Sequence, residues 1–156
     1  MSCWTAKARA RATPEQLLEV LTHPDQIRRW SPVDFDTEDV GGRPLAAGTR
    51  TKVNGRLAGV SVSFDVEVHA ADPARLELSA QGPITLEVRY DLEPADSGAE
   101  LTARVSVRRG GGITGRVVAN AAGTLLSAGA LDGAAGRIVR AAESALQAGA
   151  PVSSSR

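Results

Sequence analysis

The chain has 156 residues, in which eighteen basic and eighteen acidic side chains cancel and only 3% of residues are aromatic. The balanced charge and the scarcity of rings argue against a nucleic-acid partner, which favours a basic surface with rings for base stacking. This length suits a single domain with its own hydrophobic core, which we expect over residues 1–150, with a disordered tail over residues 151–156.

The sequence carries no signal for a metal, a cofactor or a membrane. The single cysteine, Cys3, excludes an internal disulfide and a multi-cysteine metal site. The glycine run at 110–112 lacks the lysine and the following serine or threonine of a phosphate-binding loop. The first residues lack the charged and then apolar run of a signal peptide, and no apolar stretch reaches the roughly 18 residues of a membrane span. We therefore expect a cytoplasmic protein.

Residues 3–12 alternate between a small or apolar side and a polar side, which predicts a half-buried strand. Trp4 is the large residue of the inner side, which otherwise carries Ala6, Ala8, Ala10 and Ala12.

Two short helices are predicted after this strand. Thr13 is a favourable N-cap, Pro14 suits the first helical turn, and Gln16 stands at the capping-box spacing. The residue before Pro24 resists helical geometry, so the first helix ends there and a second short helix spans residues 25–30.

Six more segments alternate between apolar and polar residues and predict strands. They recur at intervals of about ten residues and are joined by short turns, which implies an antiparallel sheet with one covered, apolar face. A sheet combined with separate helical segments defines the α+β class. The predicted strands are 33–40, 48–57, 60–68, 76–80, 84–92 and 101–107.

Residues 112–147 predict one long helix, because small and apolar residues recur three and four apart along one stripe. Five glycines inside it each cost roughly 1 kcal/mol relative to alanine, which indicates either a bend around Gly123–Gly133 or close packing against a second subunit. A monomer and a homodimer both remain open. The predicted buried stripe comprises Ile113, Val117, Ala121, Thr124, Ala128, Leu131, Ala135, Ile138, Ala142 and Leu146.

Several passages follow one another in a familiar order. Residues 12–22 read Ala-Thr-Pro-Glu-Gln-Leu-Leu-Glu-Val-Leu-Thr, residues 23–32 read His-Pro-Asp-Gln-Ile-Arg-Arg-Trp-Ser-Pro, and the strand ends near 66–73 and 92–102 are similar as well. The chain thereby resembles the START-like, or SRPBCC, superfamily. Within it, the chain is most similar to small bacterial proteins labelled polyketide cyclase/dehydrase.

This resemblance implies a helix-grip fold. Such a fold has a curved antiparallel sheet of six to seven strands, two short helices after the first strand, and a long carboxy-terminal helix across the concave face. The resemblance also implies a cavity between sheet and helix that holds a hydrophobic small molecule. It leaves the activity open, because the superfamily includes polyketide aromatase/cyclases, lipid carriers, hormone receptors and chaperone activators.

The small residues lead to the same expectation. Alanines of the first strand are predicted to face Ala121, Ala128 and Ala135 of the long helix. Few large residues are available to fill a gap between them, and an unfilled gap costs stability, so an apolar ligand is a reasonable occupant. The alternative is that small residues let the helix and the sheet approach more closely.

Polar residues facing that space are candidates to orient a ligand. Tyr90 lies on an otherwise apolar strand face, where its hydroxyl either donates to a ligand carbonyl or lies at the rim. Asn120 is costly to bury without a partner, whereas Thr124 can bond back to its own helix. Trp4 either lines the cavity or caps one end of the sheet. The predicted ligand-binding residues are Trp4, Thr51, Phe64, Leu78, Tyr90, Asn120, Thr124 and Ala128.

Signals for catalysis are weaker. His69 has outward parity beside Glu67, which favours a solvated histidine over a general base. Tyr90 and Asn120 are the candidate catalytic residues, because either could polarise a ligand carbonyl. Three functions remain open: binding without chemistry, cyclisation of a polyketide-like chain held in proximity, and protein interaction through the outer face of the sheet.

Overall fold

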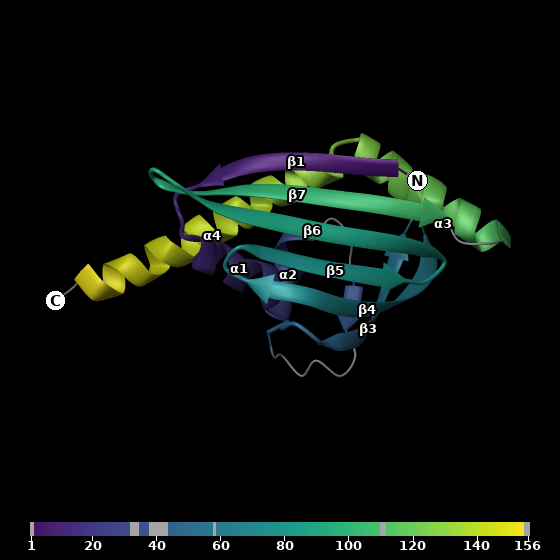
Figure 1. The fold of residues 1–156 in the computed structure, drawn as a ribbon, viewed down its shortest axis with the longest axis horizontal. Coiled ribbons are helices and arrows are strands. Elements are labelled where there is room, and N and C mark those ends of the chain that lie inside the picture. The colour runs from purple at the N-terminus through teal and green to yellow at the C-terminus, as the bar shows by residue number, and fades with distance from the viewer. Residues whose placement is uncertain (1, 32–34, 38–43, 58, 110–111, 155–156) are drawn as a thin grey trace.

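The structure is a computed structural model that describes all residues except 1, 32–34, 38–43, 58, 110–111 and 155–156 (Figure 1). The described strands are β1 Ser2–Ala10, β2 Phe35–Thr37, β3 Arg50–Leu57, β4 Val60–Asp72, β5 Arg75–Gln81, β6 Ile84–Ala95 and β7 Gly98–Arg109. The described helices are α1 Pro14–Thr22, α2 Pro24–Trp30, α3 Gly112–Ser127 and α4 Ala130–Ser154.

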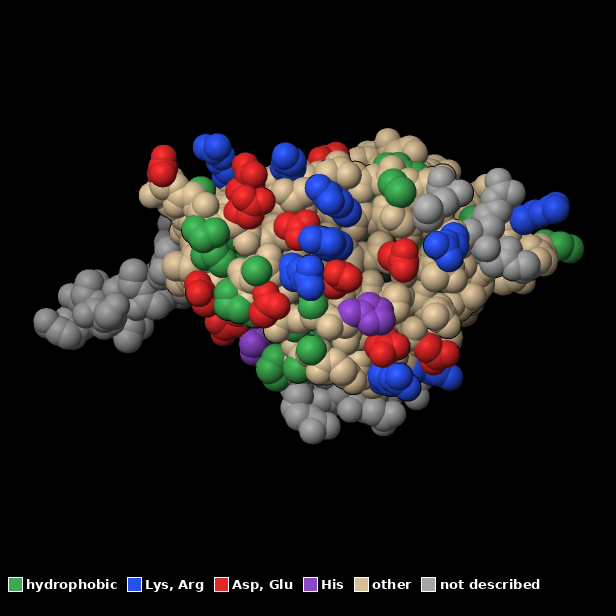
Figure 2. Space-filling view, viewed as in Figure 1, with side chains coloured by type: hydrophobic (Ala, Val, Ile, Leu, Met, Phe, Trp, Pro, Cys, Tyr) green, Lys and Arg blue, Asp and Glu red, His purple; other side chains and the backbone are tan. Residues whose placement is uncertain are grey.

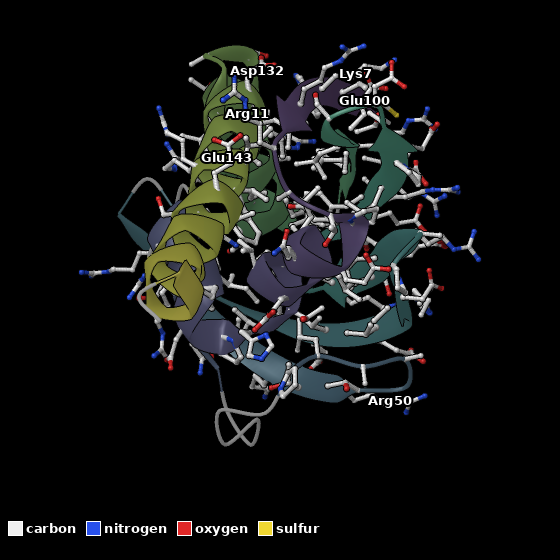
Figure 3. The ribbon with its side chains drawn as sticks, turned by 90° about the vertical axis from the view of Figure 1, so that its left-hand side faces the viewer. Lys7, Arg11, Arg50, Glu100, Asp132 and Glu143 are labelled. Atoms are coloured by element: carbon white, nitrogen blue, oxygen red, sulfur yellow. The ribbon has the colours of Figure 1, made fainter. Side chains whose placement is uncertain are left out.

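The strands form one sheet in the order β1-β7-β6-β5-β4-β3-β2, and every neighbouring pair is antiparallel. Strands β2 to β7 are neighbours in space in the same order as in the chain. Strand β1, the first in the chain, pairs with β7, the last. The helices gather on one face of the sheet (Figures 1 and 3). The predicted helix-grip fold of the α+β class is confirmed, with two short helices after the first strand.

Local signals explain where the first elements begin. In β1, Ala6 and Ala10 are buried while the side chains between them alternate toward solvent, as a half-buried strand requires. At the start of α1, the Gln16 backbone N–H donates to Thr13 Oγ1 at 3.2 Å. The Thr13 N–H donates to Gln16 Oε1 at 2.8 Å, which completes the predicted capping box.

The long carboxy-terminal helix of the prediction is not continuous: two helices replace it, and the break lies within the Gly123–Gly133 stretch where a bend is one of the two expectations. Helix α3 ends at Ser127 and α4 begins at Ala130, with Gly129 between them at a φ of 95°. Glycine adopts this left-handed conformation without a Cβ clash, which is why it ends many helices. The Gly129 N–H donates to the Leu126 carbonyl at 3.1 Å in a tightened last turn.

The break also changes which face of α3 is buried. Along α4, Leu131, Ala135, Ile138 and Ala142 are buried as the stripe predicts, and the side chain of Leu146 lies outside the described residues. Along α3 the predicted stripe is wrong. The exposed members are Ile113 at 82%, Val117 at 43% and Thr124, together with Ala128 just after the helix, and the residues buried instead are Gly115, Val118 and Ala122.

The physical reason is that the two helices rotate independently once the chain is broken between them. A shift of one residue turns a helix face by about 100°. In α3 the stripe through Val118, Ala122, Leu125 and Leu126 faces inward instead: Val118 and Ala122 are buried, and the two leucines are half-buried. A stripe read continuously across Gly129 therefore assigns the wrong face to α3.

At its other end, α4 stays helical to Ser154 and extends past the edge of the sheet (Figure 1). The chain is thus helical through residues 151–154 of the segment expected to be disordered, and residues 155 and 156 lie outside the described part.

Helix α4 makes its most extensive contact with β1. Ala6 and Ala10 of β1 are buried, as are Ala135 and Ala142 of α4. The Arg11 backbone N–H, just after β1, donates to Glu143 Oε2 at 2.8 Å, and Figure 3 shows these two residues side by side. Small residues here let helix and strand approach closely, which is the alternative to an alanine-lined cavity.

Candidate functional site

An interior pocket of about 280 Å³ lies under the junction of α3 and α4. Inner-face residues of β3, β4, β6 and β7 form its sheet side, and the end of α2 borders it. Its wall is almost entirely apolar. On the helical side the wall comes from both sides of the break, through Leu125 and Leu126 of α3 and Ala130, Leu131 and Ala134 of α4.

The size of the lining residues explains why space remains here. Phe64 of β4 and Leu86 of β6 line the sheet side of the pocket, and the leucine pair of α3 lines its helical side. Ala122 and Ala134 line the helical side as well, and their short side chains leave space that a larger residue would fill. The pocket therefore lies where large residues face each other, and not beneath the alanines of β1.

Two aromatic residues of the pocket wall, Trp30 and Tyr90, contact each other. The rings of Trp30 and Tyr90 meet edge to face, with centroids 6.1 Å apart and planes at 77°. Both side chains are buried. The indole N–H of Trp30 donates to the Val20 carbonyl at 3.0 Å, so the polar group of the tryptophan is satisfied inside the protein.

The hydroxyl of Tyr90 is in a different situation. Tyr90 is 6% exposed, and none of the described residues makes a hydrogen bond to its hydroxyl. No side-chain oxygen or nitrogen of the described residues is sealed from open space without a partner, so this hydroxyl is not sealed, and Tyr90 is a lining residue of the pocket. Burial raises the pKa of the Tyr90 phenol above its ordinary value, because the phenolate would lose its hydration. At neutral pH the group is a neutral donor.

The predicted ligand-binding residues fall into three groups. Phe64 and Tyr90 line the interior pocket. A second group lines a separate groove of about 660 Å³ on the opposite side of α3, between that helix and β1, and consists of Trp4, Asn120, Thr124 and Ala128. The third group, Thr51 and Leu78, lines neither the interior pocket nor this groove.

In that third group, Thr51 borders an open depression between β3 and β4, together with charged residues of the outer face. Leu78 shares the face of the buried Leu76 and Ala80 on β5 and packs against the core. Neither is among the described residues that line the interior pocket.

The sequence pattern predicts Asn120 and Thr124 in or near the buried stripe, but both are exposed. The cause is the rotation of α3, which turns these residues from the sheet toward the groove. The pocket residues that the prediction misses include Ala122, Leu125 and Leu126. The adjacent leucines of α3 are the available signal, because two bulky neighbours on one helix seldom both face solvent.

The histidine on the strands lies outside the pocket, as predicted. His69 Nε2 is 2.9 Å from Ser79 Oγ on the outer face of the sheet, where both side chains are accessible. This face carries basic and acidic side chains interspersed with one another (Figure 2). Within the described residues, no group of three or more His, Cys, Asp or Glu side chains is arranged to hold a metal ion. In the same part of the chain, no helix combines the length and the apolar character needed to cross a membrane.

Comparisons with solved structures show the same fold. A protein from Chromobacterium violaceum matches with a TM-score of 0.66 at 13% identity, covering 92% of this chain and 99% of that one. A Thermus thermophilus protein matches with a TM-score of 0.65 at 16% identity, covering 90% and 99%. A Rhodobacter sphaeroides protein matches with a TM-score of 0.62 at 21% identity, covering 94% and 93%. A search of curated proteins gives no match.

The sequence itself carries a family signature in addition to the fold. A family model described as "Polyketide cyclase / dehydrase and lipid transport" matches residues 1–143, which includes every element from β1 to most of α4. The interior pocket lies wholly within the matched residues. The chain therefore belongs to the polyketide cyclase / dehydrase and lipid transport family.

Proposed function

We propose that this protein binds a hydrophobic small molecule in the interior pocket, without chemistry. The observation that carries the proposal is the apolar wall around a space of about 280 Å³ under the α3–α4 junction. Ligand pockets in proteins span roughly 300–1,000 Å³, so the pocket suits a small ligand. An apolar occupant would gain contacts that the facing side chains otherwise lack.

The wall argues for binding over catalysis. Arg56 is the one charged side chain among the described lining residues, and it is exposed on β3. Tyr90 is held neutral, so it can donate a hydrogen bond but cannot serve as a base near neutral pH. The family's description names lipid transport beside cyclase and dehydrase activity, and the transport side of that description fits this wall.

A cyclase is the second candidate, and Tyr90 is the observation that favours it. Its hydroxyl could polarise a carbonyl of a folded chain while the pocket supplies proximity, which alone can contribute up to roughly 7–11 kcal/mol to an intramolecular reaction. Incubation with a soluble poly-β-ketone mimic and mass spectrometry of the products would reveal cyclisation above the rate in buffer. A rate equal to that in buffer excludes this candidate.

The test of binding uses the neutral fluorescent probe N-phenylnaphthylamine, which gains fluorescence in apolar sites. Saturable binding of the probe to the full chain is expected. Ala122→Leu adds bulk inside the pocket and should weaken probe binding by about tenfold or more. Thr124→Leu adds bulk in the groove on the other side of α3 and should leave binding unchanged. Equal effects of the two variants, or no saturable binding, would contradict the proposal.

A further inference from the structure

We infer that the ligand of this pocket is a neutral carbonyl compound with an apolar body, and that the Tyr90 hydroxyl selects it by donating a hydrogen bond to the carbonyl oxygen. This inference rests on the proposed function and specifies its ligand. It follows from the balance of hydrogen-bond donors, acceptors and charges around the pocket.

The first step is the unused donor. Tyr90 packs edge to face on Trp30 and lines the pocket, and its hydroxyl is neither sealed in the core nor hydrogen-bonded by the described residues. A ligand that covers this hydroxyl without offering an acceptor leaves it unpaired at a cost, so a ligand with an acceptor at this point is favoured. Trp30 offers no competing donor, because its indole N–H is already bound to the Val20 carbonyl.

The second step excludes an anionic ligand. A carboxylate buried in an apolar pocket needs a cation to offset its lost hydration. The one charged residue of the described lining is Arg56, which shares the outer face of β3 with Asn54 by strand alternation. Asn54 itself accepts a hydrogen bond from Ser63 on that outer face at 2.6 Å. The inner wall formed by the described residues therefore presents no cation to a carboxylate.

The third step favours a carbonyl over an alcohol. A carbonyl oxygen accepts the Tyr90 proton and carries no donor of its own. An alcohol accepts the same proton but brings a second hydroxyl hydrogen into an apolar wall. Ser31, the other hydroxyl among the described lining residues, is already engaged in an interaction. An alcohol would thus pair the Tyr90 hydroxyl but leave its own O–H donor without an acceptor.

The experiment compares three ligands of similar length by displacement of N-phenylnaphthylamine: methyl hexyl ketone, its isosteric alkene in which a methylene replaces the oxygen, and octanoate. With the native chain, the ratio of the displacing concentrations of ketone and alkene is the reference value, because water solvates the free ketone and an apolar wall by itself favours the alkene. Octanoate at neutral pH should be weaker than the ketone by about tenfold or more. In Tyr90→Phe, the ratio should shift in favour of the alkene by about 5- to 30-fold, the effect of one lost hydrogen bond, while both ligands still displace the probe.

Each other outcome has a definite meaning. If Tyr90→Phe leaves the ratio of ketone to alkene displacement unchanged, the pocket binds ligands but the inference is overturned. Tighter binding of octanoate than of the ketone also overturns it. If the probe itself does not bind, the proposed function fails first. Retained binding of the alkene shows that Tyr90→Phe is folded, so the shift in the ratio cannot be ascribed to unfolding.

Discussion

The Arg137 guanidinium donates through Nε to the Trp30 backbone carbonyl at 3.0 Å. Trp30 is the last residue of α2, and its carbonyl is one of the groups that a helix leaves without an intrahelical partner. A cation at this end also suits the helix dipole. The contact ties α4 to the end of α2, whose Trp30 lines the pocket and packs on Tyr90, so it helps to hold the pocket wall in place.

We therefore expect Arg137→Ala to lower the free energy of unfolding by about 1.5–3 kcal/mol, the range for hydrogen bonds to charged groups. Urea unfolding monitored by tryptophan fluorescence measures this change. Arg140→Ala, an exposed position on the same helix, should stay within about 0.5 kcal/mol of the native chain. Similar losses for both variants would show that the contact with Trp30 contributes little.

Tyr90 predicts a pH dependence of stability. Its folded pKa is raised, so above about pH 10 the unfolded chain releases the phenol proton while the folded chain retains it. The unfolded state then binds fewer protons, and the free energy of unfolding falls by about 1.4 kcal/mol per pH unit above that point. Below about pH 10 both states are protonated, and this residue contributes no pH dependence.

Tyr90→Phe is the control for that prediction, because Tyr90 is the only tyrosine of the chain. The variant should lack the part of the alkaline slope that comes from the phenol. Since the lost hydroxyl has no described partner, the variant should be as stable as the native chain or slightly more stable at neutral pH. Identical alkaline slopes for both proteins would contradict the raised pKa.

The junction between α3 and α4 predicts opposite effects for two glycines. Gly129→Ala forces a Cβ into a left-handed conformation and should cost about 1–2 kcal/mol of stability. Gly123 lies inside α3 with open space where a Cβ would stand, so Gly123→Ala should stabilise the protein by up to about 1 kcal/mol. Thermal or urea unfolding of both variants tests the pair. If α3 and α4 formed one continuous helix, both substitutions would stabilise it.

The close approach of Gly82 to Ser63 and Phe64 leads to a prediction about the pocket. A Cβ at this position would lie 2.9 Å from Phe64 Cδ1 and would clash with the Ser63 carbonyl. Gly82→Ala should cost about 1–3 kcal/mol and push the Phe64 ring toward the pocket, because the ring yields more easily than the backbone. Probe binding should weaken in parallel with stability. If the variant is destabilised but binds the probe as the native chain does, the Phe64 ring does not contribute to binding.

Local patterns in the sequence are enough to predict most of the fold. Alternation along the strands predicts which side chains face inward, because only one face of each strand is buried. The Thr13 capping box predicts the start of α1, since its hydrogen bonds join residues three apart. Tyr90 stands out as a polar group on an apolar strand face for the same local reason.

The face of α3 and the place of the pocket depend instead on packing between distant parts of the chain. The glycines of this segment are compatible with a straight, a bent or a broken helix. In the folded protein the chain breaks at Gly129, and α4 packs on β1 independently of α3. That break turns Asn120 and Thr124 outward and brings Leu125 and Leu126 over Phe64. Periodicity in the sequence predicts which residues share a helix face. Which face turns toward the sheet depends on contacts with strands that are distant in the chain.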